Sequence, residues 1–174
     1  ARGEDFEKCT YKNLGHIEVI DQVEVAKYLG TLPYVDKSRI GVFGWSYGGY
    51  MTSLLMTKGA DYFKAGIAVA PVTNWKFYDT IYTERYLLTP QENPNGYNDN
   101  SPINFAKLLK GKFLLMHGTA DDNVHFQNSM EFVNALVNEK KQFETFFYPD
   151  KAHSISGVRL NLYTKMTDFI LENL

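Results

Sequence analysis

A serine enclosed by glycines is the residue of this chain best suited to nucleophilic chemistry. It lies in the segment Gly44-Trp45-Ser46-Tyr47-Gly48-Gly49, between an apolar run at residues 39–43 and a helical pattern at residues 50–56. A strand, the pattern G-x-S-x-G and a helix together predict a nucleophile elbow, a sharp turn that presents the serine hydroxyl. Such a turn is strained, and the flanking glycines are expected to let strand and helix approach without Cβ clashes.

A nucleophilic serine needs a base, and four histidines are available: His16, His117, His125 and His153. His153 follows the last predicted strand, on a loop before the final helix. Where an elbow serine comes first in the chain, the acid follows it and the histidine comes last. The sequence therefore favours His153. A packed or capping role is expected for His16 and His117, and His125, at a helix start, is the alternative base.

The acid is expected between these two residues, also at the end of a strand. Asp121 and Asp122 follow the predicted strand 112–116, and the pattern alone does not separate them. A solvated turn is the non-catalytic alternative for both. The chemistry requires one buried carboxylate to fix the imidazole tautomer. The other aspartate could cap the following helix.

Three aromatic residues, Trp75, Tyr78 and Tyr82, recur at spacings i, i+3 and i+7 after Pro71-Val72. A buried core stripe is the plain interpretation of such a helix. Because the stripe begins at a strand end beside the predicted nucleophile, we expect it to form an aromatic-walled pocket for a flat, apolar substrate group.

The elements that must position these residues alternate along the chain. Strands are predicted at residues 39–43, 63–71, 112–116 and 143–148, and helices at residues 16–29, 50–58, 75–86, 126–140 and 158–172, with a loop at residues 93–102. This alternation predicts an α/β fold with a parallel sheet covered by helices on both faces. Functional residues of such sheets lie beyond the carboxyl ends of the strands.

Composition narrows the function classes. The 174 residues suit one globular domain, and a net charge of −2 gives no electrostatic footprint for nucleic acid. No apolar run approaches the roughly 18 residues of a membrane span, and no signal peptide is visible. Cys9 is the one cysteine, which excludes an internal disulfide and a C-x-x-C zinc site. No metal or cofactor is expected.

These motifs together resemble the catalytic domain of dipeptidyl peptidase IV-type serine peptidases, in the prolyl oligopeptidase family. The resemblance runs along the whole chain, residues 1–174, and implies an α/β-hydrolase fold. It is carried by the elbow and by three further segments: Ala68-Val69-Ala70-Pro71-Val72, Tyr82-Thr83-Glu84-Arg85-Tyr86 and His117-Gly118-Thr119-Ala120-Asp121-Asp122-Asn123-Val124-His125-Phe126-Gln127.

The resemblance implies a role for each site residue. Ser46 would be the nucleophile, His153 the base and Asp121 the triad acid, with the Tyr47 amide as one oxyanion donor. Asn123 would hold the carbonyl of the preceding substrate residue. The S1 pocket would be formed by Tyr47, Val72, Trp75, Tyr78, Tyr82 and Val124. The implied reaction releases N-terminal dipeptides with proline or alanine at the penultimate position, through an acyl-enzyme.

The resemblance also implies that the strands of this chain form the C-terminal half of a larger α/β-hydrolase sheet. A tyrosine hydroxyl that completes the oxyanion hole, and a β-propeller with two glutamates for the substrate amino terminus, are expected upstream of Ala1. We therefore expect little dipeptidyl peptidase activity from this chain alone. The exposed apolar edge at residues 39–43 predicts self-association, and relatives commonly form homodimers. The lack of cysteines near Ala65 and at the C-terminus favours a bacterial, periplasmic or cell-envelope protein.

Other functions remain open from the sequence. A prolyl tripeptidyl peptidase or another oligopeptidase of the same family could carry nearly the same residues. A plain esterase or lipase is a second enzyme class, which the aromatic residues and Asn123 disfavour. A non-catalytic binding relative is the alternative outside enzymes, and the presence of Ser46, Asp121 and His153 argues against it.

Overall fold

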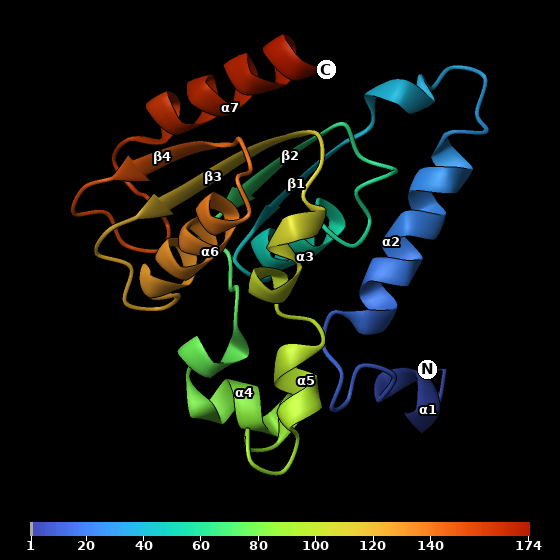
Figure 1. Cartoon of the computed structure of the whole chain (residues 1–174), viewed down its shortest axis with the longest axis vertical. Coiled ribbons are helices and arrows are strands. Elements are labelled where there is room, and N and C mark those ends of the chain that lie inside the picture. Colours follow the sequence, from blue (N-terminus) through green and yellow to red (C-terminus); the bar gives the residue numbers. More distant parts are fainter. Residues whose placement is uncertain (1) are drawn as a thin grey trace.

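The computed structural model describes residues 2–174, which form a four-stranded parallel sheet with helices on both faces (Figure 1). The strands are β1 (Gly41–Trp45), β2 (Ala65–Val69), β3 (Lys112–Gly118) and β4 (Glu144–Tyr148), in the spatial order β1-β2-β3-β4. The predicted α/β class and all four strands are confirmed. Strand β1 lies two residues later than predicted, so it leads directly into Ser46.

The pairing register brings the carboxyl ends of the strands to one edge of the sheet. Trp45 pairs with Val69 and Val69 with Met116, while Gly118 at the end of β3 pairs with Tyr148. Strand β2 is buried along its whole length, as the continuous apolar run of a strand covered on both faces requires. The loops that carry the predicted site residues therefore begin side by side.

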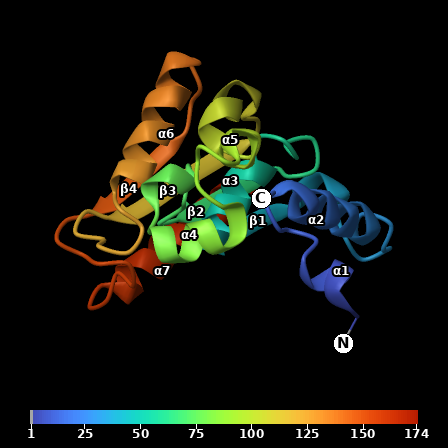
Figure 2. The same ribbon diagram turned by 90° about the horizontal axis from the view of Figure 1, so that it is seen from below.

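Helices cover the two faces of the sheet unequally. Helix α7 (Arg159–Asn173) lies on one face, and α3 (Tyr47–Leu55) and α6 (Gln127–Asn138) lie on the other (Figures 1 and 2). Helix α7 buries Leu162, Met166 and Phe169 in a core cluster with residues of β2 and β3. Helix α2 (His16–Leu29) packs outside α3, so a second layer covers the elbow helix.

The prediction of a single helix at residues 75–86 is wrong. The chain forms a 3-10 turn at Trp75–Phe77 and then α4 (Thr80–Leu87). Asp79 between them is extended, at ψ 150°, and its carboxylate accepts a hydrogen bond from Tyr82 N at 2.8 Å. An aspartate at this position caps a new helix, and this local bond ends the preceding turn.

The loop predicted at residues 93–102 is also wrong in part, because α5 (Pro94–Asn98) lies within it. Asn93 caps this helix through Gly96 N, at 3.2 Å, and Pro94 occupies its first turn. Asn-Pro thus starts a helix here instead of only ending one. A further 3-10 segment, Pro102–Leu108, then leads to β3, and another, Lys37–Arg39, precedes β1.

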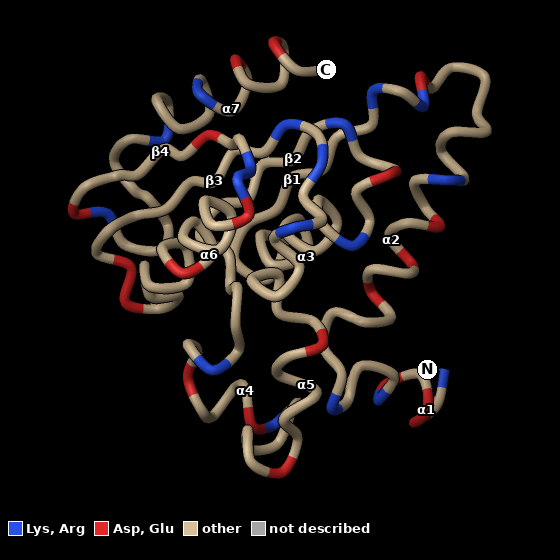
Figure 3. The backbone as a smooth tube through the Cα atoms, in the orientation of Figure 1, with Lys and Arg blue, Asp and Glu red and all other residues tan. Residues whose placement is uncertain are grey.

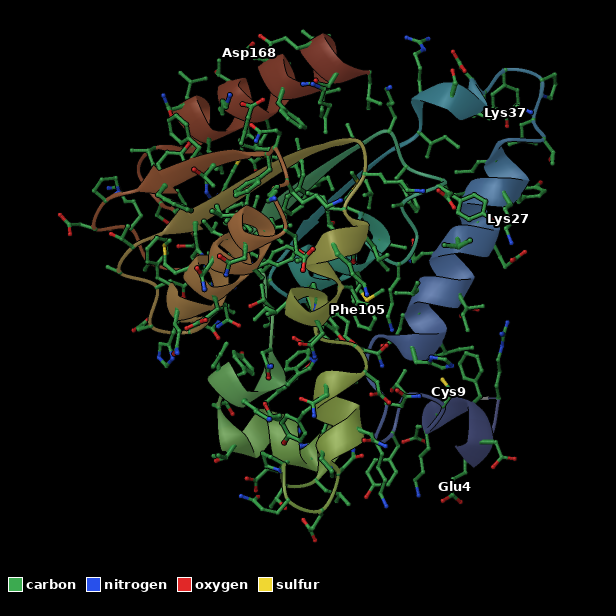
Figure 4. All side chains as sticks on the ribbon, in the orientation of Figure 1. Glu4, Cys9, Lys27, Lys37, Phe105 and Asp168 are labelled. Atoms are coloured by element: carbon green, nitrogen blue, oxygen red, sulfur yellow. The ribbon has the colours of Figure 1, made fainter. Side chains whose placement is uncertain are left out.

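Lys and Arg are interspersed with Asp and Glu along the backbone (Figure 3), and the net charge is −2. Exposed Cys9 follows the short helix α1 (Glu4–Glu7) (Figure 4). None of the helices in residues 2–174 is both long and apolar enough to cross a membrane.

Candidate active site

Ser46 occupies a strained turn between β1 and α3. Its backbone has φ 59° and ψ −117°, a conformation that L-residues rarely adopt and that costs on the order of 1–3 kcal/mol. Two backbone bonds hold the turn: Ser46 N donates to Val69 O at 2.9 Å, and Tyr50 N donates to Ser46 O at 2.9 Å. The predicted order of strand, sharp turn and helix is confirmed, at the carboxyl edge of the sheet.

Two of the elbow glycines are required by close approach. A Cβ on Gly44 would lie 2.0 Å from Gly48 O, and a Cβ on Gly49 would lie 2.8 Å from Val69 O. A Cβ on Gly48 would meet nothing within 4 Å. The expected clash is thus confirmed for a side chain at Gly44, where the backbone of Gly48 occupies the space. A side chain at Gly48 would not clash.

The loops after β3 and β4 bring Asp121 and His153 together. His153 Nδ1 lies 2.7 Å from Asp121 Oδ2, and the other carboxylate oxygen, Oδ1, accepts from Asn123 N at 3.0 Å and Val124 N at 2.9 Å. Burial alone would raise the pKa of the Asp121 carboxyl. The hydrogen bonds from His117, His153 and the Asn123 amide outweigh burial and hold this pKa well below its ordinary value. Asp121 is therefore an ionised carboxylate at neutral pH.

Asp122 has a different environment, although it is the next residue. It is exposed, and it does not cap the following helix, because α6 begins after Phe126 without a side-chain cap. The alternative that this second aspartate caps a helix is wrong. The sequence pattern did not separate Asp121 from Asp122, and in the structure Asp121 is the one that contacts His153.

His153 is held by Asp121 and by the end of β1. Its Nδ1 lies 2.7 Å from Asp121 Oδ2, and within residues 2–174 no hydrogen bond joins its Nε2 to another group. The indole N–H of Trp45, the residue before Ser46, donates to the His153 carbonyl at 3.0 Å. This bond fastens the histidine loop to the end of β1.

A glycine allows the loops of β3 and β4 to touch. A Cβ on Gly118 would lie 2.1 Å from Lys151 O, so only glycine fits at this point. Ala120 N donates to the same carbonyl at 3.1 Å, and Thr119 N donates to Tyr148 O at 2.9 Å. Backbone contacts therefore set the spacing between the loop that carries Asp121 and the loop that carries His153.

The predicted aromatic residues gather beside the elbow, although not along one helix. The ring centroid of buried Trp75 lies 5.8 Å from that of Tyr78, 5.7 Å from that of Tyr82 and 5.5 Å from that of Tyr47. Trp75 and Tyr82 are stacked, and Tyr78 meets both edge-on. Val72 and Val124 are buried in the same core cluster. The cluster supplies aromatic surface next to Ser46.

Helix α2 fixes the orientation of Tyr47. The Tyr47 hydroxyl donates to Glu18 Oε1 at 2.6 Å, and the other oxygen of Glu18 accepts from Gly15 N at 3.0 Å. Burial raises the pKa of the Tyr47 phenol far above its ordinary value, and the Glu18 carboxylate raises it further. Tyr47 therefore stays a neutral donor, and its backbone N–H begins α3 beside the Ser46 hydroxyl.

Asn123 faces a cavity at the edge of the aromatic cluster. The Tyr78 hydroxyl donates to Asn123 Oδ1 at 2.7 Å, which leaves the amide N–H groups of Asn123 free to donate elsewhere. An open cavity of about 630 Å³ borders both residues. Its remaining lining includes Lys76, Asp79, Asp122 and His125. A peptide carbonyl at this position could accept a hydrogen bond from Asn123.

The other three histidines differ from His153 in exposure and contacts. His16 and His125 are exposed, and His117 is fully buried, as its predicted packed role requires. What the sequence did not predict is that His117 contacts Asp121, at 3.0 Å from Nε2 to Oδ2. The links from Trp45 to His153 and from Glu18 to Tyr47 were also not predicted. Their partners are 108 and 29 residues apart in the chain, and no local pattern marks such pairs.

Comparison with known proteins gives consistent matches along the whole chain. Residues 1–174 match the model of the prolyl oligopeptidase family. The chain is 46% identical to dipeptidyl aminopeptidase B of Saccharomyces cerevisiae over 173 residues, which cover 97% of this chain and 21% of that protein. It is 43% identical to dipeptidyl peptidase 4 of Felis catus over 174 residues, covering 97% of this chain and 23% of that protein.

A solved structure agrees closely. The crystal structure of Porphyromonas gingivalis dipeptidyl peptidase 4 superposes with a TM-score of 0.97 at 51% identity, covering 100% of this chain and 25% of that one. The chain thus spans about a fifth to a quarter of the length of these relatives. Its sheet and helices match part of a peptidase catalytic domain.

Proposed function

The chain belongs to the prolyl oligopeptidase family, and from that premise we propose that Ser46, Asp121 and His153 form the catalytic triad of a serine peptidase. The observation that carries the proposal is the 2.7 Å contact between His153 Nδ1 and Asp121 Oδ2, on loops that leave the same edge of the sheet as Ser46 with its strained backbone. A base, an orienting acid and a serine on a sharp turn are the groups that acyl transfer requires.

The proposed reaction proceeds in two steps. Ser46 Oγ attacks the scissile carbonyl while His153 Nε2 accepts the hydroxyl proton, and Asp121 holds the imidazole in the required tautomer. The backbone N–H of Tyr47 donates to the oxyanion that forms. The leaving amine takes the proton from His153, which gives an acyl-enzyme. Water, deprotonated by His153, then attacks the acyl-enzyme and restores the Ser46 hydroxyl.

We propose that the aromatic cluster forms the pocket for the residue before the scissile bond. Its walls would be Tyr47, Trp75, Tyr78 and Tyr82, closed by Val72 and Val124. Flat aromatic and branched apolar surface suits the ring of proline or the methyl of alanine and does not pair with a charged side chain. Asn123, oriented by Tyr78, would donate to the carbonyl of the preceding substrate residue.

Release of N-terminal dipeptides is the proposed activity of the full-length protein, in line with the names of the relatives. A tripeptidyl peptidase could use the same residues 1–174. Incubating the full-length protein with two peptides, one with proline only at position two and one with proline only at position three, and identifying the products by mass spectrometry separates the two. A dipeptide product supports the proposal, and a tripeptide product contradicts it.

The nucleophile is tested by Ser46→Ala in the full-length protein. We expect the change to abolish labelling by a serine-directed fluorophosphonate and to reduce turnover of Gly-Pro p-nitroanilide by at least about 10⁴-fold, as loss of a triad serine does. Ser156→Ala, on an exposed loop, is the matched control and should keep both. Labelling that survives Ser46→Ala would contradict the proposal. A wild-type protein that is never labelled would favour a non-catalytic binding relative.

For the 174-residue chain by itself we propose low peptidase activity. We propose that residues 1–174 are part of an α/β-hydrolase domain, and that the further strands of this domain and a substrate-anchoring propeller lie elsewhere in the full-length protein. Absence of one oxyanion donor costs about 10²–10³ in rate. We also propose a homodimer and a periplasmic or cell-envelope location for the full-length protein, to be tested by light scattering and cell fractionation.

A further inference from the structure

His117 is a buried, titratable side chain that the proposed mechanism leaves without a task. It lies near the end of β3, with none of its surface exposed. Nδ1 lies 2.7 Å from Ser129 Oγ on α6, and Nε2 lies 2.8 Å from Val124 O and 3.0 Å from Asp121 Oδ2. The ring of Phe126 meets the imidazole edge-on, with centroids 5.5 Å apart. The imidazole is therefore held at each nitrogen and on its ring.

These partners determine which nitrogen of His117 carries the proton. A backbone carbonyl can only accept, so Nε2 must be protonated to bond Val124 O. The same N–H is shared with the ionised Asp121 carboxylate. In the neutral imidazole Nδ1 then carries no proton and accepts a hydrogen bond from the Ser129 hydroxyl. Ser129, His117 and Asp121 thus form a chain in which every proton points toward the carboxylate.

The result is a carboxylate held by four donors. Oδ2 accepts from His117 Nε2 on one side and His153 Nδ1 on the other, while Oδ1 accepts from the amides of Asn123 and Val124. Oδ2 is the atom that must orient His153. Without His117, Asp121 could turn about its side-chain torsion, since only His153 itself would hold Oδ2.

We propose that His117, with its tautomer set by the Val124 carbonyl and its other nitrogen held by Ser129, is a positioning residue for the triad acid Asp121. The inference rests on the proposed triad. His117 contacts no reacting atom and acts through Asp121 alone. The effect should therefore appear in the chemical step and leave substrate affinity unchanged.

Two substitutions of similar size separate this role from simple packing. The amide nitrogen of glutamine reaches about as far from Cα as His Nε2, and that of asparagine only about as far as Nδ1. His117→Gln can keep the donor to Asp121, whereas His117→Asn keeps a partner for Ser129 and loses that donor. In the full-length protein acting on Gly-Pro p-nitroanilide, we expect His117→Asn to lower kcat about 10- to 100-fold, the worth of a hydrogen bond to a charged group. KM should stay within about twofold, and His117→Gln should restore most of kcat.

Ser129→Ala provides a second route should His117→Asn fail to fold. The serine variant keeps the imidazole but removes the partner of Nδ1, so the ring is no longer held at that side and can shift relative to Asp121. We expect kcat to fall severalfold at unchanged KM. Equal kcat values for His117→Asn and His117→Gln, with wild-type kcat in Ser129→Ala, would overturn the proposal.

The failure of this inference differs from the failure of the proposed triad. Asp121→Asn and Ser46→Ala, measured beside the other variants, must each abolish turnover if the triad is correct. Should both retain turnover, the proposed function fails. Should both lose it while His117→Asn, His117→Gln and Ser129→Ala all match wild type in kcat, only the role of His117 fails.

Discussion

At the scale of single residues, two neighbouring aspartates show how environment assigns chemistry. Asp121 is buried and accepts four hydrogen bonds, while Asp122 is exposed. The donors around Asp121 hold its pKa below the ordinary value in spite of burial. One carboxylate therefore keeps its charge in the interior, where it can stabilise an imidazolium, while water screens the other.

Asn123 offers a prediction at the same scale. In Tyr78→Phe, Asn123 Oδ1 loses the donor that lies 2.7 Å away, and the amide becomes free to turn. We expect KM for Gly-Pro p-nitroanilide to rise about 2- to 10-fold, the range for one neutral hydrogen bond, while kcat changes little. Steady-state kinetics of the full-length protein measure this.

The control is Tyr28→Phe, which removes a hydroxyl from a tyrosine of α2 with 64% exposure. It should leave both constants unchanged. If Tyr78→Phe behaved in the same way, Asn123 would not depend on Tyr78 for its orientation.

At the scale of elements, the elbow depends on how closely the backbones of β1 and α3 approach each other at Gly44. The backbone of Gly48 fills the space that a Cβ on Gly44 would need, and Gly49 lies against the end of β2. The loops that carry the acid and the base meet in the same way at Gly118 and Lys151. Close backbone approach therefore shapes the turn at Ser46 and sets the spacing between the loops that carry Asp121 and His153.

Gly44→Ala and Gly48→Ala form a matched pair for this element. The methyl of Gly44→Ala would lie 2.0 Å from Gly48 O, so we expect a loss of about 1–3 kcal/mol or more in the free energy of unfolding. The methyl of Gly48→Ala enters open space in α3, and alanine favours a helix by about 0.5–1 kcal/mol. Thermal unfolding of the 174-residue chain measures both. Equal midpoints for the two variants would show that the elbow can widen without cost.

At the scale of the whole molecule, β1 is an edge strand of the described sheet and is largely apolar. Within residues 2–174 it pairs on one side only, with β2, and Phe43 is 50% exposed. An apolar groove of about 180 Å³ runs beside it, between β1 and the end of α7. Unpaired strand groups next to apolar surface favour pairing with another chain.

We therefore predict that the 174-residue chain self-associates. Light scattering should give a mass above the 19.9 kDa of a monomer, and Phe43→Lys should lower it, because a charge on an edge strand opposes pairing. Leu160→Lys, at a side chain of α7 with 83% exposure, is the control and should not change the mass. A stable wild-type monomer would contradict the prediction.

The sequence by itself determined the parts of this protein that local pattern encodes. Apolar runs predicted the four strands, and their alternation with helices predicted the parallel sheet. The glycines around Ser46 predicted the elbow, and the chain order of the serine, the aspartate pair at residues 121–122 and His153 predicted which loops would meet. Pattern failed at residues 75–86 and 93–102, where the side chains of Asp79 and Asn93 bond to nearby backbone and start helices.

Only the tertiary structure decided which groups surround the proposed triad. It placed Asp121 and not Asp122 against His153, and it joined Ser129 through His117 to the same carboxylate. It also joined Glu18 to Tyr47 and Trp45 to the His153 loop. The physical reason is that strand and helix periodicity depends on neighbours a few residues apart. Hydrogen bonds between loops depend on the register of four strands and on close contacts at glycines, which no local pattern contains.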